Sequence, residues 1–171
     1  MNLLFRLLGL IVRSVRRSGT AGVFDVTTLR MRVWPTDLDL NLHMNNGRYL
    51  SIMDIGRLDL IMRVGLFGRM ARDGIRPVVG NVQIVYRRSL APFQRFHLST
   101  QLVGWDEKWT YLRQQFHDDT GAVCADAYVR ALFVRRGVKL TSADLSALVG
   151  EGLESADVTE VSAMFQQFPR S

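Results

Sequence analysis

The sequence predicts an α+β domain in which one long helix packs against a five-stranded, largely antiparallel sheet. Its 171 residues are enough to bury a core, and the hydrophobic content of 47% is typical of a globular protein. A single long amphipathic pattern in the first half indicates the helix. One strand-like run precedes this pattern and four follow it, so we expect the helix to cover one face of a sheet.

The first strand and the helix flank a polar loop. Residues 24–34 alternate between apolar and polar side chains, as a half-buried strand does. Asn45 or Asn46 can then cap a helix that runs to about Val64, with Gly65 as its stop. One side of this helix is apolar and is expected to face the core: Tyr49, Ile52, Met53, Gly56, Leu60, Ile61 and Val64.

The later strand-like runs, separated by turn residues, cover 78–88, 96–105, 109–117 and 123–135. Short turns join the last three, so these strands should be antiparallel. Two short helical patterns follow, at 142–149 and 158–166. The helix leaves the second face of the sheet uncovered, near Val129, Ala131 and Phe133 or their neighbours of opposite parity. We expect another copy of the chain to cover it, giving at least a dimer.

The net charge of +6 is concentrated near the start of the sequence. The first 17 residues hold four arginines and no acid, which leaves about +2 for the rest. The other basic residues do not form a stripe with interleaved aromatic side chains, so we expect no nucleic-acid partner.

Residues 1–17 also form a basic amphipathic helix when placed on a helical wheel. Two interpretations are open: the helix lies in a membrane interface, or it packs on its own domain or a partner subunit. It is too short to span a bilayer and is a poor signal peptide. We expect a cytoplasmic protein, peripheral on the membrane surface under the first interpretation. The chain then divides into residues 1–22, 23–140 and 141–171.

The candidate site is the polar loop, which reads DLDLNLHMNNG from Asp37 to Gly47. Buried acids and amides are costly without partners or a task, so their clustering before a helix suggests a site. No pattern in the sequence indicates thiol, metal or serine-hydrolase chemistry. The single Cys124 is read as a core thiol, the three histidines lack metal-ligand spacing, and no Gly-x-Ser-x-Gly elbow is present. We expect neither a metal nor a cofactor.

The segment from Asp37 to Arg57 resembles the signature of hotdog-fold acyl-CoA thioesterases of the 4-hydroxybenzoyl-CoA thioesterase superfamily. It is most similar to the subgroup that contains the eukaryotic thioesterase-superfamily-member-6 proteins. The resemblance covers about residues 24–136. It implies a curved antiparallel sheet wrapped around the helix, two subunits that share two active sites, and metal-free hydrolysis of thioesters of coenzyme A or acyl carrier protein.

The resemblance also assigns catalytic roles. Asp39 falls on the carboxylate that serves as general base or nucleophile, and Asp37 on a structural acid. Asn46 and Gly47 fall at the start of the helix, where unpaired N–H groups and the helix dipole provide an oxyanion hole. His43 falls where the family commonly has a histidine.

Four more residues are expected to contact substrate: Asn45, Tyr49, Asp54 and Arg87. The sequence departs from the family pattern at two positions. Leu42 stands where glycine is common, and Asp54 where glutamate is common. We expect Asp54 to form an ion pair with Arg57 or Arg87.

Together these features predict a thioesterase that acts on fatty acyl-CoA or related acyl thioesters, as a homodimer or a dimer of dimers. One alternative is a non-catalytic hotdog module that binds acyl chains or a protein partner. Another is a hotdog dehydratase or hydratase. Those enzymes pair a catalytic histidine with an acid on the helix or facing subunit, whereas His43 lies in the preceding loop.

Overall fold

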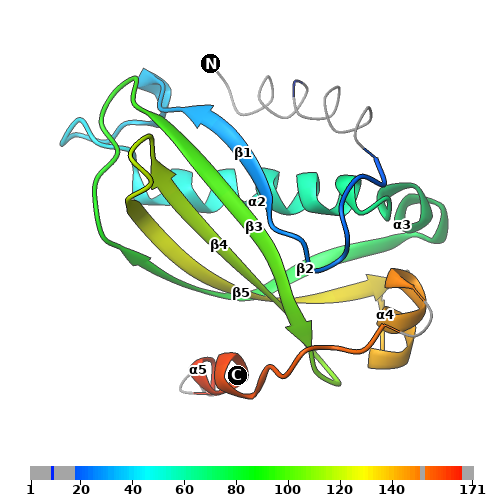
Figure 1. Cartoon of the computed structure of the whole chain (residues 1–171). Helices are drawn as coiled ribbons and strands as arrows, with labels where there is room; N and C mark the ends of the chain where they lie inside the picture. The colour runs from blue at the N-terminus through cyan, green and yellow to red at the C-terminus, as the bar shows by residue number, and fades with distance from the viewer. Residues whose placement is uncertain (1–8, 10–17, 151–152, 167–171) are drawn as a thin grey trace.

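The computed structural model describes residues 9, 18–150 and 153–166. A curled antiparallel sheet wraps around the long helix α2 (Asn46–Arg63), as Figure 1 shows. The strand order is β1-β3-β4-β5-β2, and the short β6 pairs with β5. This is the expected α+β hotdog arrangement.

The predicted elements are found with small shifts in their bounds. The strands are β1 (Thr27–Arg32), β2 (Ile75–Tyr86), β3 (Arg95–Trp105), β4 (Thr110–Asp118), β5 (Val123–Arg135) and β6 (Val138–Lys139). The other helices are the 3-10 turn η1 (Pro35–Asp37), α3 (Phe67–Asp73), α4 (Ser142–Val149) and α5 (Thr159–Met164). The sequence analysis missed η1, α3 and β6, because elements of two to seven residues are too short to establish a periodicity.

Helix α2 begins and ends at residues that suit its termini. Asn45 is the N-cap, and its Oδ1 accepts a hydrogen bond from Gly47 N–H at 2.8 Å. Gly65 follows the helix with a φ of +82°, in the left-handed conformation that helix ends commonly need. Near this end Arg63 Nε lies 2.9 Å from an Asp59 carboxylate oxygen, an i,i+4 ion pair on one side of the helix.

The main core lies between α2 and the concave face of the sheet. Gly56 allows the closest approach, because a Cβ there would lie only 2.6 Å from Thr100 Oγ1 and 2.7 Å from Leu98 Cδ2. The fully buried Gln114 fills the space beneath it. Its Nε2 donates to Met53 O at 3.0 Å and to Thr100 Oγ1 at 2.9 Å, so this amide ties the helix to the middle of the sheet.

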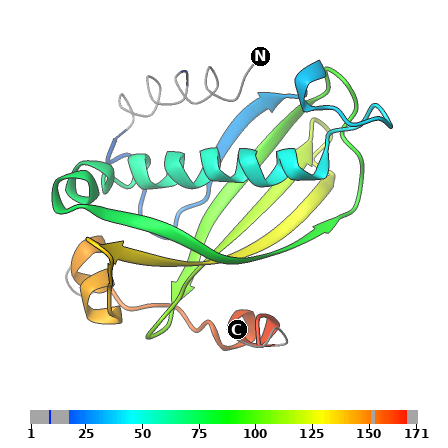
Figure 2. The same cartoon turned by 180° about the vertical axis from the view of Figure 1, so that it is seen from behind.

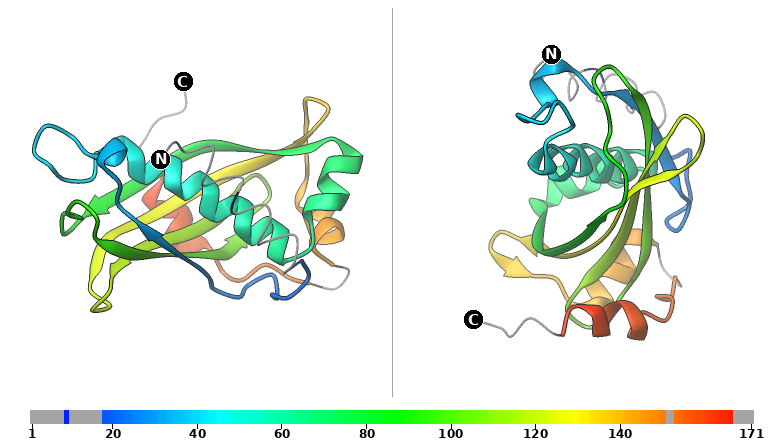
Figure 3. Two further views of the ribbon diagram at one scale, coloured as in Figure 1. Left: turned by 90° about the horizontal axis from the view of Figure 1, so that it is seen from above. Right: turned by 90° about the vertical axis from the view of Figure 1, so that its left-hand side faces the viewer.

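The convex face is covered in part by the chain itself, which the sequence analysis did not expect, and the expectation of a second subunit stays a prediction. Residues 153–166, here called the C-terminal cover, cross this face, and α5 lies on the side of the sheet opposite α2 (Figures 2 and 3). The cover's Val158 and the fully buried Phe165 form a small second core with Tyr111. Val129 and Ala131 belong to the main core, and Tyr128 packs against the second core, so the neighbours of opposite parity face the convex side.

In the part of the chain that the structure describes, no helix is long and apolar enough to cross a bilayer. Except for Gly9, residues 1–17 lie outside that part, so the two interpretations of the amphipathic segment stand as stated.

The packing at Gly56 gives a direct test of the helix–sheet contact. Gly56→Ala should lower the free energy of unfolding by about 1–3 kcal/mol, because the added methyl group overpacks a filled space. Urea unfolding followed by circular dichroism measures this. Gly68→Ala in α3 is the matched control, since nothing lies within 4 Å of its added Cβ. An equal effect of both substitutions would contradict the packing described.

Candidate active site

The polar loop between β1 and α2 folds into a tight hairpin. Leu38 and Met44 form an antiparallel bridge, and Asp39 N–H donates to His43 O at 2.9 Å. The hairpin projects past the start of α2, as Figure 3 shows. It therefore presents its polar side chains at one end of the molecule, next to the N-terminus of the helix.

Asp39 sits at the neck of this hairpin. Its Oδ1 accepts hydrogen bonds from Asn41 N–H at 2.8 Å and from His43 N–H at 3.3 Å. Its Oδ2 has no hydrogen-bond partner among the described residues, and the side chain is half-buried. One carboxylate oxygen thus fixes the side chain, while the other is open to water or a ligand.

Leu42 shows how the hairpin accommodates a residue where the family commonly has glycine. Its φ is +57°, which is the left-handed conformation that glycine adopts easily. For leucine this conformation costs roughly 1–2 kcal/mol. The backbone therefore turns as glycine would allow, and the Leu42 side chain is left 65% exposed.

Asp37 is structural, as expected. The residue is 2% exposed, and its Oδ2 accepts a hydrogen bond from Trp34 N–H at 2.9 Å. Its carbonyl accepts another from Asn45 N–H at 2.8 Å, and Arg48 Nε lies 3.8 Å from its Oδ1. These contacts join the hairpin to the first residues of α2, so they hold the two parts of the candidate site in a fixed relation.

The first turn of α2 is partly satisfied by its own cap. Gly47 N–H, an expected oxyanion-hole donor, is bonded to Asn45 Oδ1 at 2.8 Å. Arg48 N–H donates to Asn45 O at 2.8 Å. The positive end of the helix dipole still faces this region. A substrate oxyanion at Gly47 would have to displace the Asn45 carboxamide.

Tyr86, the last residue of β2, is a neighbour of the site that the sequence analysis missed. Its Oη donates to Asn46 O at 3.2 Å, and its ring packs edge-on against Tyr49 with centroids 5.1 Å apart. Burial raises the pKa of Tyr86, so the phenol remains a hydrogen-bond donor at neutral pH. No sequence signal marked it, because an aromatic residue in a strand is ordinarily read as packing.

Tyr49 and His43 differ in accessibility. Tyr49 is 2% exposed and packs against Phe116 at a centroid distance of 4.8 Å. Burial raises the pKa of Tyr49 to about 12. In the single chain it is therefore a core residue, and contact with substrate stays a prediction. His43 is exposed, and its imidazole has no hydrogen-bond partner among the described residues.

Asp54 and Arg87 lie farther from the hairpin. Asp54 forms the expected ion pair with Arg57, and the Asp54 side chain is 69% exposed. It follows Asn46 by eight residues, which places it about 12 Å along the helix axis. Arg87 is exposed directly after Tyr86, and its N–H donates to Cys124 O at 2.8 Å. Substrate contacts from both residues remain predictions.

Metal ligation depends on where the histidines, the cysteine and the acids lie in the fold. His97 of β3 and His117 of β4 lie directly opposite each other in the β3–β4 register. Even so, the described ranges contain no group of three or more His, Cys, Asp or Glu side chains that could hold a metal ion. Cys124 is buried, as expected, and burial raises the pKa of its thiol.

Comparison with known proteins agrees with this architecture. Residues 33–167 match the family model of the thioesterase-like superfamily. The chain belongs to this superfamily. Protein THEM6 of Xenopus laevis is 38% identical over 104 residues, which cover 61% of this chain and 48% of that protein. The probable thioesterase YBR096W of Saccharomyces cerevisiae is 28% identical over 144 residues, covering 82% of this chain and 61% of the yeast protein.

Solved thioesterase-like structures share the fold. The probable thioesterase YbaW of Escherichia coli superposes with a TM-score of 0.65 at 26% identity, over 72% of this chain and 98% of the bacterial one. The chain spans about half the length of the first curated relatives it matches, with 48% for the Xenopus protein and 42% for THEM6 of Danio rerio. Membership of the thioesterase-like superfamily and the hotdog fold are thereby shown.

Proposed function

We propose that this member of the thioesterase-like superfamily hydrolyses fatty acyl-CoA or related acyl thioesters, with Asp39 as general base or nucleophile. The observation that carries the proposal is the open Oδ2 of Asp39, on a carboxylate whose other oxygen is fixed by the hairpin. Contacts of Asp37 with Asn45 and Arg48 attach this hairpin to the electropositive start of α2. These contacts support a proposed base and a proposed oxyanion stabiliser at the same end of α2.

In the general-base route, Asp39 Oδ2 accepts a proton from water, whose oxygen attacks the thioester carbon. In the nucleophilic route, Oδ2 attacks that carbon and water then hydrolyses the mixed anhydride. In both routes the charge on the carbonyl oxygen is stabilised at the first turn of α2, once the Asn45 carboxamide releases Gly47 N–H. The tetrahedral intermediate expels a thiolate, which leaves readily because its thiol has a pKa of about 8.5.

Hydrolysis is tested by substituting Asp39. Asp39→Asn should lower kcat for palmitoyl-CoA about 10²–10⁴-fold, because the amide can neither accept the proton of water nor attack. Release of free thiol measures the rate. Asp119→Asn, at an exposed turn between β4 and β5, is the matched control and should retain the wild-type rate. Equal rates for wild type and Asp39→Asn would exclude Asp39 from the chemistry.

A non-catalytic hotdog module is the second candidate function. The hydrogen bond from Gly47 N–H to Asn45 favours it, because this bond occupies an oxyanion donor. Under this alternative, wild-type protein binds acyl-CoA or a protein partner but releases no thiol from acyl-CoA of any chain length.

We also infer that two copies pair along β2, which forms one edge of the sheet. Four apolar or aromatic side chains of this strand are 40–55% exposed: Val78, Val79, Val85 and Tyr86. A long edge strand that carries such side chains is prone to pair with another chain. Because Tyr86 also contacts Asn46, a second copy on β2 would lie beside the start of α2 and help to enclose the site.

Pairing is tested by adding a charge to the edge. Val79→Glu should convert the dimer to a monomer, because dimerisation would bury an unpaired carboxylate. Size-exclusion chromatography with light scattering measures the mass. Val138→Glu is the control, on a residue that is 72% exposed in β6. A dimer that survives Val79→Glu would place the interface elsewhere.

Peripheral membrane contact through residues 1–17 is a further part of the proposal, supported by their basic amphipathic pattern. The full chain should float with vesicles that contain anionic lipid, and a chain lacking residues 1–17 should remain in the soluble fraction. Raising the salt concentration should weaken flotation, because the arginines act electrostatically. Equal flotation of both chains would contradict membrane contact through residues 1–17.

A further inference from the structure

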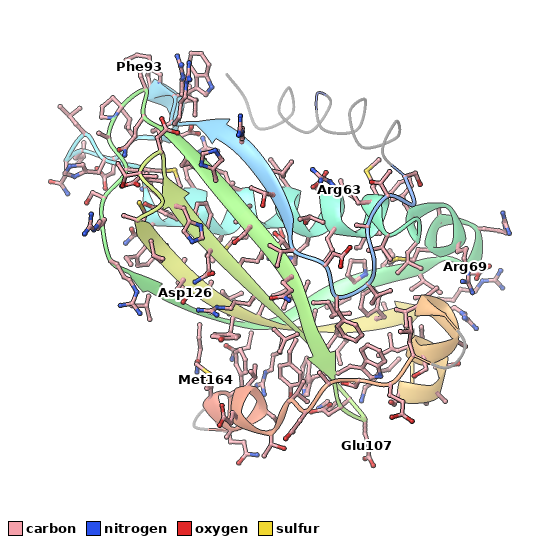
Figure 4. The ribbon with its side chains drawn as sticks, in the orientation of Figure 1. Arg63, Arg69, Phe93, Glu107, Asp126 and Met164 are labelled. Atoms are coloured by element: carbon pink, nitrogen blue, oxygen red, sulfur yellow. The ribbon has the colours of Figure 1, made fainter. Side chains whose placement is uncertain are left out.

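A pocket of about 340 Å³ lies between the convex face of the sheet and the C-terminal cover. It is at the opposite end of the sheet from the Asp39 hairpin, near the β3–β4 turn where Figure 4 labels Glu107. Strands β4 and β5, this turn, α5 and the residues just after α5 supply its walls: Asp106, Glu107, Lys108, Trp109, Tyr111, Arg130, Ser162 and Gln166. The proposed thioesterase chemistry uses none of these residues.

Arg130 is a cation without an acceptor in this pocket. Its guanidinium carbon lies 4.7 Å from the centroid of the Trp109 ring and 5.2 Å from that of Phe165. These rings stabilise the charge but accept no conventional hydrogen bond. Its Nε is buried, and in the described part of the chain no hydrogen bond or ion pair reaches the guanidinium. A buried donor left unpaired is costly, so this Nε is available to an oxygen acceptor from outside the chain.

Asp106 does not supply that oxygen. Its Oδ1 accepts from Trp109 N–H at 2.6 Å and from Lys108 N–H at 2.7 Å, and its Oδ2 accepts from Tyr111 Oη at 2.7 Å. Burial by itself raises the pKa of Asp106, but these hydrogen bonds outweigh burial and lower it. The carboxylate is therefore charged and already satisfied. Glu107 is exposed, and Figure 4 shows its side chain extending away from the sheet.

The walls around Arg130 are firmly placed. The Trp109 ring lies over Gly80 of β2, where an added Cβ would come within 2.3 Å of the ring. On the other side, the Ser162 hydroxyl of α5 lies 3.1 Å from Tyr111 Oη. The pocket therefore combines a fixed aromatic wall, a guanidinium and hydroxyl groups.

We propose that this pocket binds a small oxyanion, a carboxylate or a phosphate group, through the guanidinium of Arg130. The planar fork of arginine suits two-point binding of either group. Arg130 belongs to the sheet, whereas Ser162 and Gln166 belong to the C-terminal cover. A bound anion would therefore hold the cover against the sheet. This site is independent of the proposed thioesterase function.

The test titrates the full chain with inorganic phosphate and, in a separate arm, with acetate. Sodium chloride at equal ionic strength is the reference for both. We expect a saturable rise in Tm of about 2–4 °C, because a ligand that binds only the folded state stabilises it. Hydrogen exchange of residues 158–166 should slow in parallel. The anion with the larger effect identifies the ligand class.

Arg130→Met should abolish both responses. Arg113→Met is the matched control and should retain them. Arg113 lies on the same sheet and near an aromatic ring, 5.5 Å from the centroid of Tyr128, but it already pairs with Asp126 at 2.8 Å. Its loss removes an arginine from the convex face without removing the unpaired guanidinium.

Arg130→Met also removes a contact with Phe165, so Arg130→Lys provides a second variant that keeps the positive charge. It should weaken phosphate or acetate binding roughly tenfold, because one strong charged hydrogen bond is lost with the fork. The proposal is overturned if neither anion raises the Tm of the wild type beyond chloride. It is equally overturned if Arg130→Met responds as the wild type does.

Discussion

The close contact between α2 and the middle of the sheet is the constraint on which the rest of the fold depends. Gly56 removes a side chain at the point of contact, and Gln114 fills the space with three hydrogen bonds: two donated to Met53 O and Thr100 Oγ1, and one accepted from Arg57 Nη1 at 2.7 Å. A buried amide is tolerated only when it is satisfied in this way. Because the contact fixes the helix axis, it also fixes where the first turn of α2 meets the polar hairpin.

Hydrogen bonds from backbone N–H groups hold the side chains of the candidate site in place. The Asp39 carboxylate is held by the N–H groups of Asn41 and His43, and Asn45 caps the helix through Gly47 N–H. Such a site needs few particular side chains, provided that the turn and the helix start keep their shape. Leu42 illustrates this tolerance, since it takes up the conformation of glycine and leaves the hairpin intact.

The sequence was sufficient for those features that depend on neighbours along the chain. Alternation located the strands, and a polar residue before an apolar periodicity located the Asn45 cap. Features that depend on contacts between distant segments were not predictable in this way. Tyr86 and Asn46 are forty residues apart in the sequence but hydrogen-bonded in the fold. The packing of the C-terminal cover on the convex face likewise cannot be predicted from the periodicity of its residues. The open oxygen of Asp39 likewise follows from the folded hairpin, because a short acid in a turn has several hydrogen-bonding choices.

The phenol of Tyr86 joins an edge of the sheet to the beginning of the central helix. A contact that moves this edge would therefore also move the Asn46 carbonyl, which lies in the first turn of α2. The geometry at the start of α2 therefore depends partly on what contacts the outer edge of β2.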